Sequence, residues 1–506
     1  MISNQADAYR TYRRNIAAFS RDVIGYPLYK YQITWAQHIM DVVASHQNKT
    51  IVVKMPRQSG KNEASAQLEV AILARFGVKG GEIVKVAPTF KPQIVNSKLR
   101  LDLRSRQAMD RLPELQFRAT MGYMLRCRNA GISFLSADPK ASVVGATASL
   151  LLEVDEAQDV QPAIYDKNFA PMRSSTAAPV VAYGTTWSDD TLLQLLENDV
   201  LEGRTPGQVF TVTVDAVAAE NPAYGDYVTA ETARLGRQHP LIKTQYYMEV
   251  LANRGRIFNK TQLQSMLGDH LSQTGRTTQT QIVAGLDFAG ADENAGELIS
   301  ITTGSKRDSV ALTIGAVTWN RVVVGVIEPS VRILARYEWT NLHPLSLNSV
   351  LYTLLAQTWK ISRIHCDATG IGATGTSLLA KQLDPAGSGR VVARIFDGSW
   401  NTQTELASYY IAAVNAGRLL DYKPTGFDPI AIAGQPEPDR NDPDHHAWWQ
   451  RGHARLEARP SQRFRAYVPQ TEGHDDLLIS EMLMVEAAHH LLPQTEVKQT
   501  QRARTQ

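Results

Sequence analysis

The stretch "IVVKMPRQSGKNEAS", residues 51–65, decides how the N-terminal half of the chain is interpreted. An apolar run ends in a polar loop with Gly60 and Lys61, and a helical pattern begins near Asn62. A phosphate-binding loop needs this order, because its backbone N–H groups, its lysine and the following helix N-terminus all attract phosphate. The usual pattern G-x-x-x-x-G-K-[ST] is incomplete, since Met55 replaces the first glycine and Asn62 the hydroxyl residue. The stretch alone is equally consistent with a chance strand-turn-helix.

A second motif lies downstream in "LLLEVDEAQ", residues 150–158. An apolar run ends in Asp155 and Glu156, where an aspartate can hold the shell of a Mg²⁺ ion and a glutamate can orient or deprotonate water. A solvated turn would explain the same residues. The joint occurrence of both motifs in one parallel-sheet pattern favours a nucleotide site.

Further nucleotide contacts are predicted around these two motifs. "YGTTW" (183–187) ends the next apolar run, and Thr185 and Thr186 there could sense the γ-phosphate, although a plain turn explains them as well. Gln32 or Gln37 could read an adenine edge, and Arg57 could place positive charge on the γ-phosphate or form a surface ion pair. Asn62 could supply the Mg²⁺ oxygen that a hydroxyl residue usually supplies. The residues of the loop itself predicted to bind nucleotide are Arg57, Gln58, Ser59, Gly60, Lys61 and Asn62.

Strand-like and helical patterns alternate along the first half. Apolar runs at 50–55, 82–88, 131–137, 149–156 and 179–187 are separated by helical segments, the clearest being "NEASAQLEVAILARF". Continuous apolar strands that alternate with helices indicate a parallel sheet covered on both faces. The segment 215–255 is helix-rich and is expected to form a lid or linking subdomain of this first domain, 1–255.

A second series of strands follows a polar linker expected over 256–281. Strand patterns at 282–290, 309–319 and 321–329 resemble an antiparallel meander, and those at 333–340 and 361–370 continue into helix-and-strand alternation. This order predicts a mixed α/β domain over 282–490 that differs from the first. The polar end, 491–506, is expected to be disordered.

The second domain carries acids at the ends of its predicted elements. Asp287 interrupts an apolar strand, where an unpaired charge is costly. Asp367 ends another strand, and Asp475 and Asp476 begin an amphipathic helix. Three separated carboxylates of this kind suit a pair of Mg²⁺ ions on a scissile phosphate. An N-cap role for Asp475 or Asp476 and a turn role for Asp367 are the alternatives.

Two basic stretches are also candidates for nucleic-acid contact. The first is "RNDPDHHAWWQRGHARLEARPSQRFR" (440–465), which combines arginines with Trp448 and Trp449, and a solvated helix with a buried tryptophan pair explains it equally well. The second is Arg100, Arg104 and Arg106, which could contact DNA or a neighbouring subunit.

Composition limits the class of protein. The 506 residues allow roughly two to four domains. No run approaches the ~20 apolar residues of a membrane span. Two distant cysteines give neither a disulfide framework nor a zinc cluster, which fits a reducing cytoplasm. A net charge of only +3 means that any nucleic acid must be bound by local patches.

Together these motifs resemble the large terminase subunit of tailed double-stranded DNA bacteriophages. The resemblance rests on "PRQSGKN", "LLLEVDEAQ" and "YGTTW", then on "GLDFAGAD", "HCDATG" and "GHDDLLISE", in the family's order over roughly 25–490. It implies an α/β chain with an N-terminal P-loop ATPase domain of the ASCE or RecA-like type on a parallel sheet. A C-terminal RNase H-like nuclease domain on a mixed sheet would follow.

The resemblance also implies roles and partners. Lys61 would bind phosphates, Asp155 Mg²⁺, Glu156 would be the catalytic glutamate, and Arg57 an arginine acting in cis. Thr185 and Thr186 would lie in the coupling motif. Asp287, Asp367 and Asp475 or Asp476 would hold Mg²⁺ or Mn²⁺ for cutting. The implied cofactors are ATP and Mg²⁺, and the implied partners are double-stranded DNA, the portal protein and the small terminase subunit.

In this interpretation the protein is a DNA-packaging ATPase and endonuclease. It would act in the host cytoplasm and transiently at the procapsid portal, with no membrane partner. A ring of copies is expected on the procapsid, and a monomer is possible in solution. Two other interpretations stay open. One is a helicase-like or repair ATPase without nuclease activity, and the other a structural docking subunit with an inactive ATP site.

Overall fold

The computed structural model describes residues 12, 14–120, 123–139, 145–252, 254–277, 280–288, 309–323, 326–340, 342–370, 372–426, 428–429, 438 and 441–493. The chain forms two compact units. The N-terminal unit comprises Met1–Thr229, Lys243–Ala252 and Pro460–Gln462, and the C-terminal unit Ala230–Ile242, Asn253–Arg459 and Arg463–Gln506. Among the described helices none is long and apolar enough to cross a membrane.

The N-terminal unit is built on an eight-stranded sheet of the described residues, in the order β3-β4-β5-β2-β6-β7-β1-β8. The six strands from β5 to β8 in that order are parallel, and β3 and β4 add an antiparallel edge. The strands are β1 Thr50–Lys54, β2 Gly81–Ala87, β3 Phe117–Thr120, β4 Met124–Cys127, β5 Ala130–Ser136, β6 Leu151–Val154, β7 Val180–Gly184 and β8 Gly207–Thr211. Strands β1, β6 and β7 are buried along their whole length, as the apolar runs predict.

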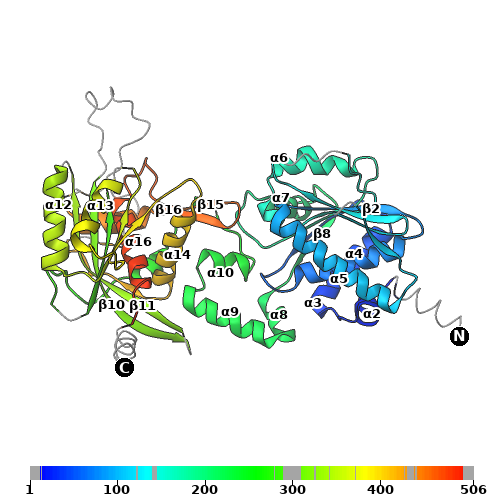
Figure 1. Ribbon diagram of the computed structural model, residues 1–506, viewed down its shortest axis with the longest axis horizontal. Coiled ribbons are helices and arrows are strands. Elements are labelled where there is room, and N and C mark those ends of the chain that lie inside the picture. Colours follow the sequence, from blue (N-terminus) through cyan, green and yellow to red (C-terminus); the bar gives the residue numbers. More distant parts are fainter. Residues whose placement is uncertain are drawn as a thin grey trace, which may run out of the picture. The chain divides into compact units, whose positions relative to one another are not determined.

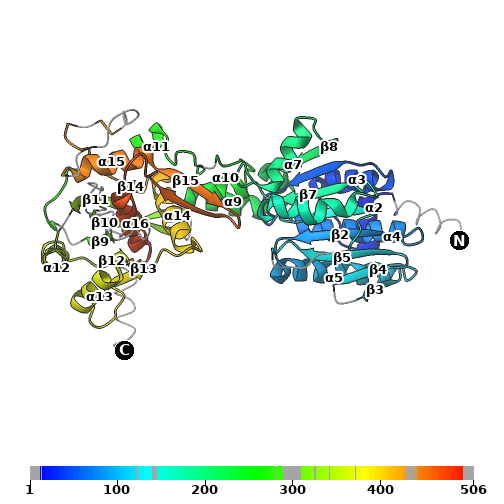
Figure 2. The same ribbon diagram turned by 90° about the horizontal axis from the view of Figure 1, so that it is seen from above.

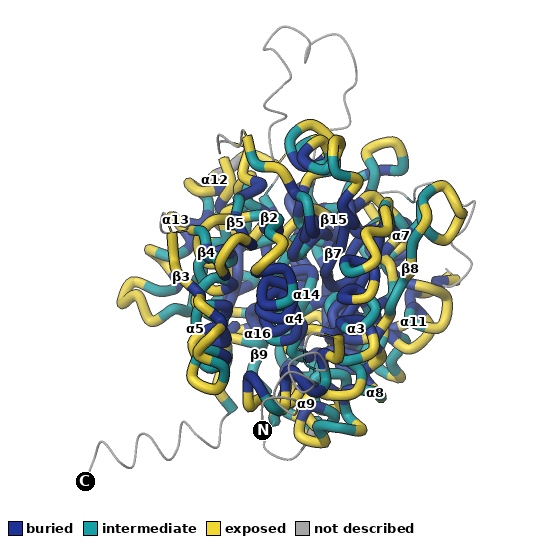
Figure 3. Tube along the Cα trace, turned by 90° about the vertical axis from the view of Figure 1, so that its right-hand side faces the viewer, coloured by how far each residue is buried: buried dark blue, intermediate teal, exposed yellow. Residues whose placement is uncertain are grey.

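Helices cover both faces of this sheet, and Figure 1 shows α7 and α3 to α5 on opposite sides of it. Trp35 of α3 packs edge-on against Tyr183 of β7 on one face, and Leu192 and Leu193 of α7 pack on the other. Helix α4 follows β1 and is almost entirely buried, as its colour in Figure 3 shows. The α-helices are α2 Ile16–Ala18, α3 Lys30–Ala44, α4 Lys61–Phe76, α5 Val95–Arg111, α6 Pro162–Ile164, α7 Leu192–Leu201 and α8 Val214–Glu220. Short π-helical segments are η1 Phe19–Ile24, η2 Phe90–Ile94 and η4 Tyr165–Phe169, and short 3₁₀ segments are η3 Ala157–Asp159 and η5 Ala170–Arg173.

The segment predicted to be helix-rich, 215–255, contains most of α8 and then α9 (Pro222–Leu235) and α10 (Pro240–Gln245). The boundary between the compact units runs through both of these later helices. The predicted linker, 256–281, contains a further helix, α11 (Lys260–Ser265).

The C-terminal unit contains a six-stranded mixed sheet of described residues, in the order β13-β12-β9-β10-β11-β14. β9, β10 and β11 are antiparallel neighbours, whereas β12 and β13 run parallel to β9. The strands are β9 Gln281–Asp287, β10 Val310–Val323, β11 Val326–Trp339, β12 Arg363–Asp367, β13 Val391–Arg394 and β14 Leu419–Leu420, and β15 Arg455–Arg459 and β16 Arg463–Tyr467 form a separate hairpin. The helices are α12 Pro344–Tyr352, α13 Gly372–Leu383, α14 Asn401–Asn415, α15 Pro443–His453 and α16 Asp476–His489, with a short turn η6 Thr353–Thr358.

The predicted meander exists, but one of the strands predicted for it is wrong. The residues 321–329 do not form a strand of their own, because β10 continues to Val323 and β11 runs from Val326 to Trp339. The predicted strand ends at Pro329, whereas the observed one passes through it. Proline has no N–H to donate, but it is tolerated here because its nitrogen faces away from β10. The N–H of Val331, two residues further on, points to that same side and donates to Arg418, and β14 pairs there only with Val331 and Arg332.

Helix α16 lies across the C-terminal sheet and contacts β9, β10, β11 and β12 (Figure 2). The close approach depends on Gly285 of β9. A Cβ atom there would meet the backbone oxygen of Ser480 at 1.9 Å and the backbone nitrogen of Met484 at 2.4 Å. Because the obstacles are backbone atoms, a larger residue could be accommodated only by moving the helix.

We therefore expect Gly285→Ala to destabilise the C-terminal unit by about 3 kcal/mol or more, the upper part of the usual range for overpacking. Thermal unfolding of the full chain measures this effect as a lower midpoint of the transition of that unit. Gly398→Ala is the matched control, because a Cβ atom at Gly398 meets nothing within 4 Å. Equal midpoints for the two variants would contradict the described packing of α16.

Candidate functional site

The order of the strands brings the predicted nucleotide motifs to one edge of the N-terminal sheet. β7 lies between β6 and β1, and all three are parallel, so the segments that follow them meet at their carboxyl ends. The loop 55–60 follows β1, Asp155 and Glu156 follow β6, and Thr185 follows β7. The backbone N–H of Met55 donates to the Gly184 oxygen at 3.1 Å, which joins the loop directly to the end of β7.

The loop adopts the conformation that its sequence predicts. Gly60, just before α4, has a φ of 86°, a left-handed conformation that glycine adopts without strain. The hydroxyl of Ser59 donates to the oxygen of Pro56 at 2.6 Å and tightens the turn. Lys61 is the first residue of α4, as the predicted strand-loop-helix order requires.

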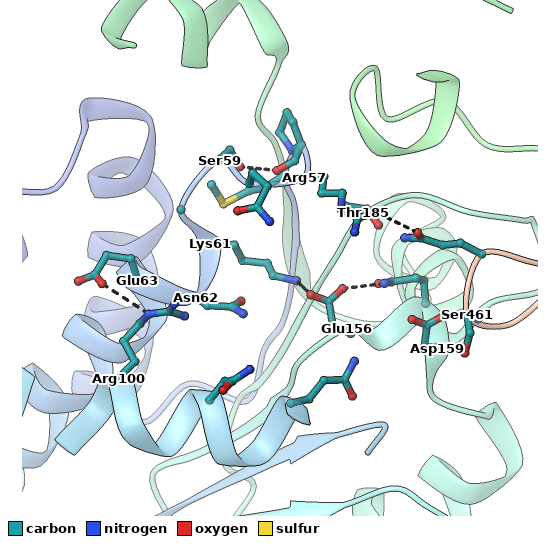
Figure 4. A pocket seen from close by; sticks show the side chains of 18 of the residues that line it. Arg57, Ser59, Lys61, Asn62, Glu63, Arg100, Glu156, Asp159, Thr185 and Ser461 are labelled. Atoms are coloured by element: carbon teal, nitrogen blue, oxygen red, sulfur yellow. Dashed lines mark hydrogen bonds and ion pairs between the residues drawn. The ribbon is translucent and has the colours of Figure 1, made fainter. Parts of the chain in front are cut away.

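Lys61 is the electrostatic centre of this site (Figure 4). Its Nζ lies 2.6 Å from Glu156 Oε1 and 3.3 Å from Asp155 Oδ1. Burial alone would raise the pKa of the Asp155 carboxyl, but Lys61 and then Lys85 outweigh burial and hold that pKa below its usual value. Burial likewise opposes the charged form of Lys61, yet Glu156 and Asp155 keep its pKa raised. Both groups are therefore ionised at neutral pH.

Several buried oxygens that follow these strands lack a protein partner. Asn62 Oδ1, Thr185 Oγ1 and Thr186 Oγ1 find no hydrogen-bond partner within the described part of the chain. Buried acceptors are normally satisfied, so these atoms fit a ligand, a cation or water. A neutral carboxamide oxygen is a ligand that Mg²⁺ accepts, and Asn62 therefore fits the role predicted for it.

The two glutamines predicted as candidates for reading adenine have hydrogen-bond partners within the protein. The amide nitrogen of Gln32 donates to the backbone oxygens of Ser59 and Gly60 at 3.3 and 3.2 Å, and its oxygen accepts from the Tyr29 backbone at 3.0 Å. Gln32 thus holds the loop, and the prediction that it reads adenine gains no support. Gln37 binds Ile16 and Arg14 in a similar way.

Arg57 also has a protein partner. The residue is exposed, and its guanidinium donates to the side-chain oxygen of Gln245 at 2.9 Å. It lines the same cavity as Lys61, so its position is compatible with the predicted contact to a phosphate.

This cavity, of about 700 Å³, includes residues that the sequence motifs did not single out. Gln158 donates to Glu156 Oε2 at 2.7 Å, and Gly184 leaves the space that the side chain of Gln158 fills. Asp159 accepts from the Ser461 backbone at 2.6 Å, and burial raises its pKa to about 6. Gln158 and Asp159 belong to "DEAQD", so closeness to Glu156 was the available signal. The other such lining residues are Tyr26, Glu63, Gln93, Asn96 and Gln462.

The arginine cluster on α5 is partly explained by this cavity. Arg104 donates to Glu63 Oε1 at 2.6 Å and stacks over the ring of Tyr26, with 4.4 Å between the guanidinium carbon and the ring centroid. Arg100 lines the cavity and lies 3.7 Å from Glu63. Of the three arginines, Arg106 is exposed.

The predicted acids of the C-terminal unit lie at the same end of its sheet. Parallel pairing ends with Cys366 opposite Leu286, so Asp367 and Asp287 are the next residues on two neighbouring strands. The start of α16 lies toward Asp287, because Asp476 accepts from Ser309, two residues before the Ala311 that pairs with Asp287. Ser480 then lies over Gly285, and Met484 approaches Gly315, which pairs with Val283, so α16 runs antiparallel to β9. Asp475 is the residue before α16, and Asp476 is its first residue.

Burial makes two of these carboxyl groups, those of Asp367 and Asp475, harder to ionise. It raises the pKa of Asp367, and burial followed by the nearby charge of Asp476 raises the pKa of Asp475 to about 6. Asp476 Oδ2 accepts from the backbone and the hydroxyl of Ser309, at 2.9 and 2.6 Å. Within the described ranges, no three histidine, cysteine, aspartate or glutamate side chains form a group that could hold a metal ion.

The basic, aromatic stretch has a structural role along its first part. Trp448 and Trp449 of α15 are buried, and Arg451 is paired with Asp421 and Glu481 in the interior, so a buried tryptophan pair is the better explanation there. Arg440 lies outside the described residues. The later arginines lie on the β15–β16 hairpin, where they alternate with buried apolar residues.

Solved structures with a similar architecture include large terminases of several phages. The large terminase of one thermophilic bacteriophage (crystal form 2) aligns with a TM-score of 0.50 at 10% identity, over 91% of this chain and 98% of its own. The HK97 bacteriophage large terminase gives a TM-score of 0.40 at 13% identity, over 94% and 99%. The large terminase nuclease from thermophilic phage G20c, with bound magnesium, gives 0.28 at 13% identity, over 46% and 96%. No protein-family model and no curated protein matches the sequence.

The chain has the fold of a phage large terminase. The resemblance predicted from the motifs is thus confirmed as a likeness of fold, and so is the predicted fold class of a parallel-sheet α/β domain followed by a mixed-sheet domain. At 10% identity this terminase likeness leaves the chemistry to be argued from the residues of this chain.

The unpartnered oxygen of Asn62 gives a direct test. We expect Asn62→Ala to weaken ATP binding by about tenfold when Mg²⁺ is present, since loss of a group that supports a metal costs about that much. In EDTA the variant and the wild type should bind ATP equally. Calorimetric titration measures both affinities, and Asn62→Thr, which restores the usual hydroxyl, should recover the Mg²⁺-dependent part. Equal weakening with and without Mg²⁺ would argue against metal ligation by Asn62.

Proposed function

We propose that this protein is the large subunit of a viral DNA-packaging terminase. ATP hydrolysis in the N-terminal unit drives double-stranded DNA through the portal into the procapsid, and a metal-dependent endonuclease in the C-terminal unit cuts the concatemeric genome. The observation that carries the proposal is the convergence of Lys61, Asp155 and Glu156 at one edge of the parallel sheet.

The geometry of the N-terminal unit supports ATP hydrolysis. Lys61 follows a loop whose backbone leads into the N-terminus of α4, so charge and N–H groups favour phosphate at the same point. Asp155 and Asn62 would hold Mg²⁺, which supplies charge neutralisation on the phosphates when bound. Phosphate would compete with Glu156 for Lys61, and Glu156, still held by Gln158, would then be available to orient water.

The arrangement of acids in the C-terminal unit supports metal-dependent cleavage. Asp287, Asp367, Asp475 and Asp476 come from one strand end, its neighbour and the start of α16. Mg²⁺ is commonly held by one or two carboxylates, with water and phosphate oxygens as the remaining ligands, so a preformed group of three is not required. The Mg²⁺ or Mn²⁺ would supply Lewis acidity at the scissile phosphate when DNA is bound.

The two other interpretations explain less of the structure. A helicase-like or repair ATPase without a nuclease gives no reason for Asp287 and Asp367 to occupy adjacent strand ends. A docking subunit with an inactive ATP site leaves unexplained why Lys61 is kept buried and charged between Asp155 and Glu156. The first alternative predicts no DNA cleavage, and the second predicts no ATP turnover.

The remaining assignments follow from this function. We propose an ATPase domain over 1–255 with a lid over 215–255, a linker over 256–281 and a nuclease domain over 282–490. The last part, from 494, lies outside the described residues. The portal protein and the small terminase subunit would be partners in the host cytoplasm, with a ring of copies on the procapsid. Arg57 would act on the γ-phosphate after leaving Gln245, and Thr185 and Thr186 would respond to the loss of that phosphate.

Lys61 tests the ATPase half of the proposal. We expect Lys61→Ala to lower DNA-stimulated ATP turnover by at least about 100-fold, since the lysine is an electrostatic group aimed at the phosphates. Phosphate release by the full chain measures this loss, with the exposed Lys79→Ala as the control. Glu156→Gln keeps the shape of the site, and we expect it to bind ATP without turning it over. Turnover by Lys61→Ala at the wild-type rate would refute the motor assignment.

Asp287 tests the nuclease half. We expect Asp287→Asn to reduce Mg²⁺- or Mn²⁺-dependent nicking of supercoiled plasmid by at least about 100-fold, because it removes a carboxylate from the reacting phosphate. ATP turnover should be unchanged. The exposed Asp269→Asn is the control, and EDTA should abolish nicking by every variant. If Asp287→Asn nicks plasmid as fast as the control, the cleavage site lies elsewhere.

A further inference from the structure

A closed ring of hydrogen bonds surrounds the start of α16, beside the proposed nuclease acids. Ser309 Oγ lies 2.5 Å from Glu338 Oε1 and 2.6 Å from Asp476 Oδ2, and its one hydroxyl hydrogen can be donated to only one of these two oxygens at a time. The backbone N–H of Ser309 also donates to Asp476 Oδ2, at 2.9 Å. Ser309 therefore connects the first residue of α16 to a side chain of β11.

The ring closes through helix α15. His446 Nδ1 lies 2.9 Å from the second oxygen of Glu338, and Gln450 Nε2 lies 3.2 Å from His446 Nε2. The side-chain oxygen of Gln450 accepts from the backbone N–H of Leu478 at 2.8 Å, in the first turn of α16. Because an amide nitrogen only donates, His446 Nε2 accepts and Nδ1 carries the hydrogen toward Glu338.

This ring is held in the protein interior. Ser309, His446 and Gln450 are fully buried, and the side chain of Glu338 is 1% exposed. A buried carboxylate without good partners is costly, so an arrangement of this kind persists only where its bonds are well formed. The same ring reaches α16 twice, at Asp476 and at Leu478, which fixes both the position and the rotation of its first turn.

The register of the sheet places this ring beside the strand end that carries Asp287. Ala311 of β10 lies opposite Asp287 on one side and opposite Glu338 on the other. The three residues form one row across three strands and point to the same face, the face on which Ala311 packs with Leu477 of α16. Glu338 thus shares a row with Asp287 while it supports Asp476.

We propose that Glu338, with Ser309 and His446, is a positioning residue for the nuclease site, and that it fixes the carboxylate of Asp476 for divalent-metal binding. The inference rests on the proposed nuclease function. Groups that support a metal ligand typically change metal affinity or activity by 10–100-fold when removed. Glu338 acts through Ser309 and is therefore a positioning group for the ligand.

The test compares metal requirement with stability in the full chain. We expect Glu338→Gln and Ser309→Ala each to raise the Mn²⁺ or Mg²⁺ concentration for half-maximal plasmid nicking by about tenfold, while ATP turnover is unchanged. The unfolding midpoint should fall in both variants, as it should in any variant that removes a buried bond to α16. Thr313→Val is the matched control. It removes a buried bond between β10 and α16, from Thr313 Oγ1 to Ser480 Oγ at 2.7 Å, one turn further along the helix from Asp476.

Each result has a distinct meaning. A normal metal requirement in Glu338→Gln and Ser309→Ala overturns the inference, and so does an equal shift in Thr313→Val, which would indicate general loosening of α16. Mn²⁺ binding measured by calorimetry separates a failure of the proposed nuclease function from a failure of the proposed positioning role of Glu338. If the wild type binds Mn²⁺ but does not nick DNA, the nuclease function fails, and tenfold weaker binding by Glu338→Gln still supports the positioning role. If the wild type neither binds nor nicks, both fail.

Discussion

The ion group of Lys61, Glu156 and Asp155 is the interaction on which the nucleotide edge depends. A lysine that is 8% exposed stays charged only with good partners, and both of its partners follow a strand two places away from β1 in the sheet. A second buried ion pair lies nearby: Lys85 of β2 lies 2.6 Å from Glu69 of α4. Glu153 of β6 lies 3.8 Å from Lys85, but burial raises the pKa of its carboxyl well above the usual value. Removing one member of a buried pair typically costs 3–5 kcal/mol. The positions of α4, β2 and β6 are therefore coupled through charge as well as through apolar packing.

The C-terminal unit uses the same device around α16. Arg336 and Arg451 are fully buried and share Asp421 and Glu481 as partners, and Tyr410 donates to Glu481 at 2.6 Å. Arginine suits this setting because its planar group makes several hydrogen bonds at once. Because α16 contacts four strands, these ion pairs help to fix its distance from the sheet. The glycines of β9 and β10 let the helix lie close enough for the bonds to form.

Much of this could be predicted from the sequence, because the signals were local. The strand over 50–54, the loop and the start of α4 follow from an apolar run, a Gly-Lys pair and a helical period. The meeting of Lys61 with Glu156 follows from one rule, that parallel strands end at a common edge. What could not be predicted depends on contacts between distant segments. From its sequence Gln32 suits a base edge, but in the fold this glutamine is buried and its amide donates to carbonyl groups of the loop. Residues 326–329 are part of β11 because β10 pairs with them on one side, while β14, on the other side, pairs only with Val331 and Arg332. The sequence alone does not show which strands are neighbours.

The role of Glu338 belongs to this second kind, which explains why it carries no signal in the sequence. In "ILARYEWT" it is an ordinary glutamate near a strand end, with neither the spacing nor the glycine-rich context that marked Asp367. Its position matters only because β11 pairs with β10 in the register that aligns Glu338, Ala311 and Asp287. A shift of one residue would turn Glu338 to the opposite face of the sheet and leave Ser309 with one carboxylate instead of two. The register of the hairpin therefore determines how the first turn of α16, and with it Asp476, is oriented.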